Sequence, residues 1–325
     1  MSEETEWAIP QTAQPRADEC AFDLHRALAS VVAVRAEIPS DGFTASILGT
    51  ERAGNGVVID QRGLILTIGY LITEAESIWV TALSGKAAPA HVVGYDQTTG
   101  FGLIQALGRL DAPPLELGTA AAVQVGDAVT IAGEGGLAHA LQASVVSKRE
   151  FAGYWEYVLD EAIFTCPPHP SWGGAACIGA DGRLQGIGSL FVQEARGEGI
   201  ASQGNMIVPI DLLSPILDDL MTLGRVDRPP RPWLGMYTSE AEDTVFVAGV
   251  ASGGPADRAG IKPGDFVLEV AGTRVTDLGA TFRRVWAVGP AGSDIPLTIA
   301  RDGNLHRITI HSADRNDFLK KPPLH

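Results

Sequence analysis

Brief apolar or alternating runs follow one another from Val31 to about Ser147, and Gly, Asp and Asn turns separate them. Examples are SVVAVRAEI, GNGVVID, LILTIGYLI, SIWVTAL and DAVTIAG. This spacing predicts an antiparallel sandwich or barrel and argues against a βαβ sheet. The same rhythm continues through YWEYVLDEAIF, GRLQGIGSLFV and GNMIVPI, so the predicted fold class is mainly β.

Helical patterns occur at only a few places. Asp18 is a candidate N-cap for a short helix with Ala21, Leu24 and Leu28 on one face. The stretch IDLLSPILDDLMTLG predicts a second helix that Gly224 ends. The charged, proline-rich stretch RVDRPPRP then predicts a linker. Beyond the linker, GPADRAG and LGATFRRVWAVG are predicted as helical pieces among short strands.

A chain of 325 residues is long for one domain and comfortable for two. We expect an N-terminal arm with a short helix over residues 1–29, a first domain over 30–224 and a linker over 225–231. A second domain is expected over 232–312, followed by a tail over 313–325.

The net charge of −15 disfavours phosphate backbones and anionic lipid surfaces as partners. The longest basic runs are pairs, Arg283-Arg284 and Lys320-Lys321, so we expect no nucleic-acid binding. No segment approaches the roughly 18 apolar residues of a membrane span, and we expect no membrane partner. The N-terminal segment is acidic and does not resemble a secretory signal. We therefore expect a cytoplasmic location, with a periplasmic one as the alternative if the start omits a leader.

Cysteine and histidine patterns give no sign of a cofactor. The three cysteines, Cys20, Cys166 and Cys177, are too few for a disulfide framework, and we expect Cys166 and Cys177 to be reduced. His and Cys nowhere show metal-ligand spacing, and no glycine run is followed by Lys-Ser or Lys-Thr. We therefore expect neither a metal nor a nucleotide cofactor.

Five stretches together resemble the HtrA/Deg family, in which a trypsin-like double β-barrel is followed by a PDZ domain. The most specific is GPADRAGIKPGDFVLEVAG, which is similar to the PDZ signature of short helix, Pro-Gly-Asp turn and strand. The front half carries GNGVVIDQRGLILT, AHVVGYDQTTGFGLIQA, LELGTAAAVQVGDAVTIAGEGGL and LDEAIFTCPPHPSWGGAACIGADGRLQGIGS in the family's order. The resemblance covers about residues 30–312.

The resemblance also locates the catalytic positions, and none holds its usual residue. Tyr70 lies where the family has its histidine, Gly100 where it has its aspartate, and Trp172 where it has its serine before Gly-Gly. A phenol with a reference pKa of about 10 is a poor proton acceptor at neutral pH, and an indole cannot form an acyl-enzyme. We therefore expect a pseudoprotease with no catalytic residues.

An alternative that the residues leave open is a working serine endopeptidase with a rearranged site. Ser171 would be the nucleophile and His169 its base, although Pro170 between them restricts both neighbours. The aromatic residues at the old site also allow two interpretations. The aromatic side chains either fill the cleft where a protease would bind its substrate or line a new pocket, and we expect them to fill the cleft. They are Tyr70, Trp172, Tyr154, Trp155 and Tyr157.

The PDZ resemblance implies binding of protein or peptide C-termini as an added strand. RPWLGMY is similar to the family's binding loop, so the amides of Leu234, Gly235 and Met236 are expected to bind the terminal carboxylate. Phe282 and Val285 either complete a side-chain pocket or belong to the core of this small domain. The resemblance also implies a possible homo-oligomer.

Overall fold

The computed structural model describes residues 7–197 and 199–321 and divides into two compact units. Unit 1 comprises residues 1–149, 161–226 and 320–325, and unit 2 comprises 150–160 and 227–319. Residues 150–160, which we expected in the first domain, are therefore grouped with unit 2. Parts of the predicted N-terminal arm (1–6) and tail (322–325) lie outside the described residues.

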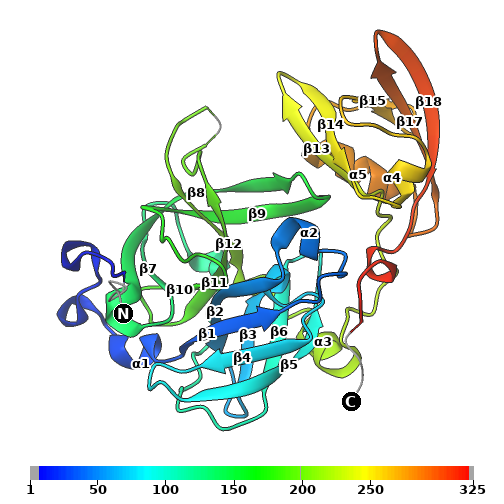
Figure 1. Ribbon diagram of the computed structural model, residues 1–325. Coiled ribbons are helices and arrows are strands. Elements are labelled where there is room, and N and C mark those ends of the chain that lie inside the picture. Colours follow the sequence, from blue (N-terminus) through cyan, green and yellow to red (C-terminus); the bar gives the residue numbers. More distant parts are fainter. Residues whose placement is uncertain (1–6, 198, 322–325) are drawn as a thin grey trace, which may run out of the picture. The chain divides into compact units, whose positions relative to one another are not determined.

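Six antiparallel strands form a closed barrel in the first half of unit 1, drawn blue to cyan in Figure 1. They close in the order β1-β2-β3-β6-β5-β4. Alternate residues of β5 are buried, whereas β3 is buried along its whole length. The strands are β1 (Val31–Glu37), β2 (Glu51–Val58), β3 (Leu64–Ile68), β4 (Ser77–Thr81), β5 (Ala87–Tyr95) and β6 (Phe101–Ala106).

A second closed barrel follows in the order β10-β11-β12-β9-β8-β7 and is drawn green in Figure 1. Its strands are β7 (Ala128–Ala132), β8 (Ala140–Gly153), β9 (Tyr157–Cys166), β10 (Ala176–Ile178), β11 (Leu184–Val192) and β12 (Gly204–Pro209). The predicted double β-barrel is confirmed. The turn between β8 and β9 lies within residues 150–160, the part of this hairpin that belongs to unit 2.

The helices of unit 1 are shorter than the sequence predicts. Helix α1 (Leu24–Leu28) is capped by Asp23, whose carboxylate accepts a hydrogen bond from the Arg26 amide, so the prediction of Asp18 as the cap was wrong. The predicted helix before Gly224 is interrupted at Pro215, which cannot continue a helical hydrogen-bond ladder. The segment has a 3₁₀ turn (Ile210–Leu212) and then α3 (Leu217–Leu223), which Gly224 ends in the left-handed conformation. The other helix here is α2 (Ala45–Leu48).

Unit 2 is a six-stranded antiparallel sheet with two helices, drawn yellow to red in Figure 1. Its strands are β13 (Met236–Ala241), β14 (Thr244–Val250), β15 (Phe266–Val270), β16 (Thr273–Arg274), β17 (Asp294–Arg301) and β18 (Asn304–His311). The helices are α4 (Pro255–Arg258) and α5 (Leu278–Val288), at the two predicted helical pieces.

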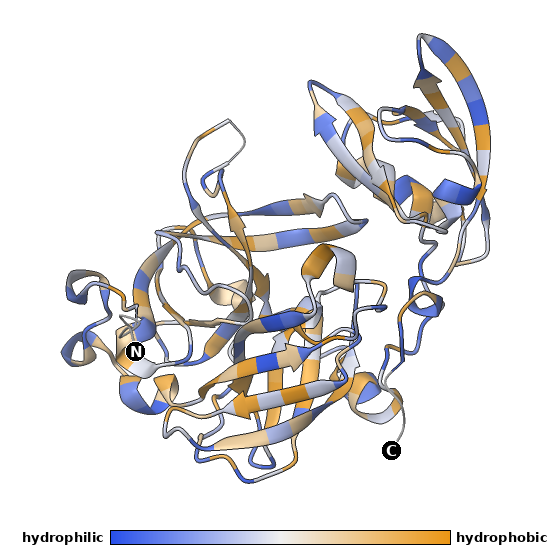
Figure 2. Ribbon diagram, in the orientation of Figure 1, coloured by the Kyte–Doolittle hydropathy of each residue, from blue (hydrophilic) through white to orange (hydrophobic). Residues whose placement is uncertain are grey.

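The core of unit 2 lies between α5 and the sheet. Alternate apolar residues of β17, Ile295, Leu297 and Ile299, are buried there together with Phe282 of α5. Figure 2 shows apolar and polar residues interspersed along these strands, as expected for a sheet that is covered on one side. No helix of the described residues is long and apolar enough to cross a membrane.

Candidate functional site

Tyr70 lies beside the loop that carries Trp172. It follows β3 in a 3₁₀ turn (Gly69–Leu71), and a Cβ placed on Gly173 would be 2.8 Å from its hydroxyl oxygen. The hydroxyl donates a hydrogen bond to the Ser189 carbonyl at 2.9 Å. Burial raises the pKa of this phenol above its usual value of about 10. Tyr70 is therefore a protonated donor and cannot act as a general base at neutral pH.

Gly100 brings no carboxylate to this site. Its φ of +84° lies in the left-handed region, and its carbonyl accepts a hydrogen bond from the Gly69 amide, next to Tyr70. The nearest acidic residue along the chain, Asp96, accepts a hydrogen bond from the Thr99 amide within its own turn. The backbone of the segment predicted to carry the aspartate thus contacts the Tyr70 turn, and Gly100 supplies no orienting side chain.

Trp172 is half-buried, and its ring packs against Phe191 with 5.7 Å between the ring centroids. Its carbonyl accepts a hydrogen bond from the Ala175 amide, which closes the tight turn before β10. Gly188 permits this turn, since a Cβ there would be 2.2 Å from the Trp172 carbonyl oxygen. Trp172, at the predicted position of the nucleophile, thus packs as an apolar residue.

The hydroxyl of Ser171, the alternative nucleophile, accepts a hydrogen bond from the side-chain amide of Asn55. Asn55 of β2 is fully buried, and its Nδ2 donates to the Ser171 hydroxyl at 3.1 Å and to the Ser171 and Gly173 carbonyls at 3.0 Å each. Its Oδ1 accepts a hydrogen bond from the Glu134 amide. A side-chain amide donates and does not take up a proton, so Asn55 holds the loop and does not activate the hydroxyl.

His169 is fully buried and uses both ring nitrogens in the loop. Its Nδ1 accepts a hydrogen bond from the backbone amide of Ser171 at 3.1 Å, and its Nε2 lies 3.0 Å from the His139 carbonyl oxygen. This arrangement fits the neutral ring with its proton on Nε2. Burial also lowers the pKa of His169. The nitrogen that would have to receive the Ser171 hydroxyl proton is already occupied by an amide.

The oxyanion site that this assignment predicts would also lack a donor. In a trypsin-like triad, the hole is formed by the amide of the nucleophile and the amide two residues before it. Counting back from Trp172, that second position is Pro170, which has no N–H. The amide of Gly174, in the same turn, is hydrogen-bonded to the Gly188 carbonyl. Sequence reasoning missed Pro170, although the signal was visible two residues before Trp172.

The predicted carboxylate loop of unit 2 holds a carboxylate of the same chain. The side chain of Glu156 accepts hydrogen bonds from the amides of Leu234 (3.0 Å), Gly235 (2.7 Å) and Met236 (3.2 Å). Gly235 has a φ of +73°, which lets the three amides converge. Burial raises the pKa of Glu156 to about 7, although these amides act in the opposite direction. Nothing in the sequence pattern had indicated Glu156.

Phe282 and Val285 are both buried in the core of unit 2. The same cluster contains Leu234, Met236 and Val158, which is contributed by residues 150–160. The two helix residues therefore pack as core residues, and one of their neighbours in the cluster comes from the segment that carries Glu156.

The aromatic residues upstream of the old site belong to unit 2. Trp155 stacks on Tyr157 with 5.5 Å between centroids, and Phe151 lies against both. Tyr154 makes an edge contact with Tyr237 of β13 at 6.1 Å. These residues form an aromatic cluster within unit 2, whereas Tyr70 and Trp172 belong to unit 1. That all five fill one cleft stays a prediction.

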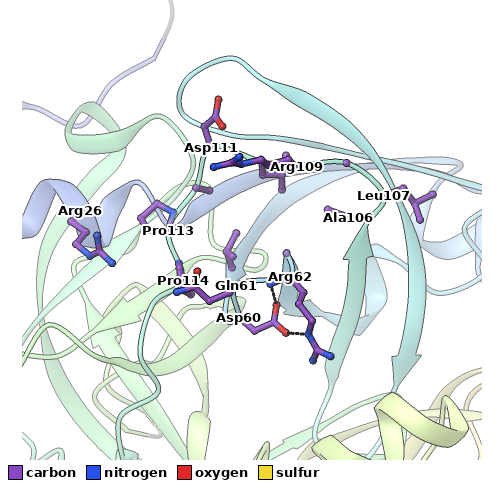
Figure 3. A pocket seen from close by; sticks show the side chains of 15 residues that line it. Arg26, Asp60, Gln61, Arg62, Ala106, Leu107, Arg109, Asp111, Pro113 and Pro114 are labelled. Carbon is purple, nitrogen blue, oxygen red and sulfur yellow. Dashed lines mark hydrogen bonds and ion pairs between the residues drawn. The ribbon is translucent and has the colours of Figure 1, made fainter.

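A surface pocket of about 650 Å³ lies in unit 1, apart from the triad positions. Figure 3 shows Arg26, Arg109 and Asp111 around it, with Arg62 paired to Asp60. The three cysteines are free thiols, and no group of three or more metal-ligating side chains occurs within residues 7–197 and 199–321. Both positively and negatively charged side chains line the pocket, and its lining residues do not form a recognisable catalytic arrangement.

Two family models match the chain. A trypsin-like peptidase domain model matches residues 54–187, and a PDZ domain model matches residues 232–311. Among solved structures, an HtrA-type protease AlgW with a decapeptide superimposes with a TM-score of 0.53 over 92% of this chain and 98% of that chain. At 21% sequence identity, this likeness shows a shared fold.

Curated relatives match most of this chain and are themselves longer. A probable periplasmic serine endoprotease DegP-like of Halomonas elongata is 28% identical over 82% of this chain and 57% of its own length. A putative serine protease HhoA of Synechocystis is 26% identical over 80% of this chain and 70% of its own length. The chain thus spans little more than half of the Halomonas elongata relative. The two family matches in this order, with these relatives and the shared fold, show that the chain belongs to the HtrA/Deg-like family.

Proposed function

We propose that this chain is a catalytically inactive HtrA-like pseudoprotease that binds peptides or proteins through its PDZ domain. The observation that carries the proposal is the triad itself: Tyr70, Gly100 and Trp172 supply no base, no carboxylate and no nucleophile. Losing the nucleophile or the base of a triad costs on the order of 10⁶ in turnover. The loss of a donor at Pro170 supports the same conclusion.

A working serine endopeptidase is the second candidate, because the relatives are named serine proteases. The nucleophile of such an enzyme would be Ser171, the residue next to Trp172. The contacts of Ser171 with Asn55 and of His169 with the Ser171 amide speak against that role. Proton transfer from the hydroxyl to His169 would require the ring nitrogen to give up its present partner.

A fluorophosphonate probe tests the proposal, since it labels only an activated serine. We expect no labelling of the purified chain and no cleavage of unfolded casein above background, with trypsin as the positive control. Ser171→Ala serves as the matched variant. Labelling or cleavage that disappears in Ser171→Ala would establish the endopeptidase instead.

The partners we propose are protein or peptide C-termini that end in an apolar residue. Two observations support this: the AlgW neighbour was solved with a decapeptide, and the amides of Leu234, Gly235 and Met236 donate to the carboxylate of Glu156. Titration with a free-carboxylate peptide and its amidated form tests this role. Equal binding of both forms would contradict it. A homo-oligomer remains a prediction, which light scattering of the purified chain would check.

The cytoplasmic location also remains a prediction from the acidic N-terminal segment. The Halomonas elongata relative is named a periplasmic protein, which favours the alternative. Fractionation of the native host with an antibody against unit 2 distinguishes the two compartments.

A further inference from the structure

Within unit 2, the segment 150–160 places a carboxylate on the loop that is expected to bind a peptide terminus. Glu156 is 8% exposed, and one of its oxygens, Oε1, accepts from all three amides of the loop Leu234–Met236. Charge-assisted hydrogen bonds of this kind are among the stronger polar contacts in proteins. A buried side chain of the same chain therefore takes up the donors that an external carboxylate would need.

The backbone of the segment also pairs with β13. The Thr238 amide donates to the Tyr154 carbonyl at 3.0 Å. Tyr154 lies two residues before Glu156, and Thr238 lies two residues after Met236, so the two chains run in opposite directions. Hydrogen-bonded residues of an antiparallel pair recur every second residue, and an added peptide strand uses the same spacing. The segment thus imitates both the terminus and the third-last residue of a bound peptide.

Apolar contacts accompany the polar ones. Val158 is 7% exposed and belongs to the core cluster that includes Phe282 and Val285, and Ala152 packs against the same cluster. Covering these side chains removes apolar surface from water, which stabilises the bound position of the segment. Apolar side chains of the segment are therefore packed with the core of unit 2, which holds the segment in place.

Helix α5 contacts both strands of the same hairpin. Arg283 forms ion pairs with Glu150, at 2.7 Å, and with Asp160. Gly279 leaves room for this contact, since a Cβ there would be 2.1 Å from Glu150 Oε1. The side chains of this ion-pair group are 42% or more exposed, so the pairs help to align the segment more than they stabilise it.

Glu156 also carries backbone strain. Its φ is +61°, in the left-handed region that non-glycine residues rarely adopt. Such a conformation costs free energy and persists where surrounding contacts hold it. The three amides and the Thr238 pairing are the contacts that hold this turn, so the turn is free to relax once the segment leaves.

From these contacts we propose that residues 150–160 are an internal ligand of the PDZ groove, which an external peptide must displace. Glu156 stands for the peptide's terminal carboxylate. The inference rests on the proposed peptide binding, and it adds that the groove is regulated by the chain itself. Removing the Glu156 carboxylate should therefore open the groove.

The test uses the full chain and two variants. Glu156→Gly removes the carboxylate and suits the positive φ. Glu242→Gly is the matched control, because Glu242 is an exposed residue of unit 2 with a φ of +47°. Hydrogen exchange of residues 233–237 is measured first without any peptide. Fluorescence anisotropy then gives the affinity for a labelled hexapeptide ending in Tyr-Ala-Val with a free carboxylate, with its amidated form as a control.

We expect Glu156→Gly to speed exchange at residues 233–237 and to tighten peptide binding at least tenfold, with Glu242→Gly unchanged in both. If hydrogen exchange at residues 233–237 is unchanged in Glu156→Gly, the internal-ligand proposal is wrong, regardless of the peptide affinity. Faster exchange with unchanged peptide affinity would overturn the competition. Faster exchange with no carboxylate-dependent binding to any variant would support the internal contact and overturn the proposed peptide function instead. Glu156→Gln, which keeps the side-chain shape, repeats the test if the glycine variant does not fold.

Discussion

The Gly235 amide donates a hydrogen bond to Glu156 Oε1 at 2.7 Å, across 79 positions of the sequence. This contact joins the loop expected to bind partners to a turn between two barrel strands. An unbound PDZ groove would leave the same amides to water. Here they satisfy a buried carboxylate, so the groove is occupied before any partner arrives.

The Glu156 contact should depend on pH. Burial raises the pKa of Glu156 to about 7, from an ordinary value of 4.5. The folded state then binds the extra proton between these two values, so the contribution of Glu156 to stability is fully present below about 4.5 and is lost as pH rises through about 7. The ionisable groups that interact with it are Arg315 and Tyr237.

Urea unfolding at pH 5 and pH 8 measures this dependence. The difference in free energy of unfolding between the wild type and Glu156→Gln should shift in favour of the wild type by up to about 3 kcal/mol when the pH is lowered from 8 to 5. Each pKa unit corresponds to about 1.4 kcal/mol. Comparing the two proteins cancels the titration of all other groups that they share. Parallel curves for the two proteins would contradict the prediction.

Replacing Gly235 by valine should disable the carboxylate loop. A φ of +73° strains any side chain, and a Cβ there would be 3.0 Å from the Trp233 ring. We expect a loss of stability of about 1–3 kcal/mol and the loss of carboxylate-dependent peptide binding. Gly303→Val is the control: Gly303 has a φ of +74° with open space around it, far along the chain from the loop. Both variants should be destabilised, and only Gly235→Val should lose the peptide.

Asn55→Ala should destabilise unit 1. The change removes three donated hydrogen bonds and leaves the Glu134 amide without its side-chain acceptor. Unsatisfied buried polar groups cost about 1–3 kcal/mol each, so we expect a total loss of about 2–4 kcal/mol in the free energy of unfolding. Asn304→Ala, at an exposed turn, is the control and should change stability by less than about 0.5 kcal/mol. A small effect of Asn55→Ala would show that the loop holds without it.

Local patterns explain what the sequence predicted well. The strands and the PDZ signature depend on residues close in sequence, such as the alternation in β17 and the positive φ of Gly235. The misplaced cap is also a local matter, since Asp18 and Asp23 both precede the helix and only the structure selects Asp23. Contacts between distant segments leave no such pattern.

The features that define the candidate sites are mostly of this distant kind. Asn55 and Ser171 are 116 positions apart, and Glu156 and Leu234 are 78 apart. A single sequence shows that Asn55 lies between glycines, but not which loop it holds. Glu156 looks like an ordinary surface residue of a turn until the fold places it on three amides. Pro170 is different, because its missing N–H could have been deduced from the sequence.

The groove should prefer peptides with an aromatic third-last residue. Tyr154 occupies that position in the internal segment, and its ring contacts Tyr237 with 6.1 Å between centroids. Such aromatic pairs are worth about 0.5–1.5 kcal/mol, so replacing Tyr by Ala at this position of the peptide should weaken binding roughly threefold to tenfold. The measurement uses the Glu156→Gly background. The preference should vanish in Tyr237→Ala, and a preference that survives there would point to another contact.

Restoring the three triad side chains should not restore proteolysis. In the triple variant Tyr70→His, Gly100→Asp and Trp172→Ser, the new aspartate would stand at a φ of +84°, and residue 170 would still lack an amide donor. Removing one oxyanion donor alone costs about 10²–10³ in turnover, and a misplacement of about 1 Å can cost a further 10²-fold. We expect casein cleavage to stay at background and fluorophosphonate labelling to be far slower than that of trypsin. A quadruple variant that adds Pro170→Gly should be labelled faster than the triple one, because the missing donor returns. Rapid labelling of the triple variant itself would show that the loop geometry is competent and that only the three side chains had been lost.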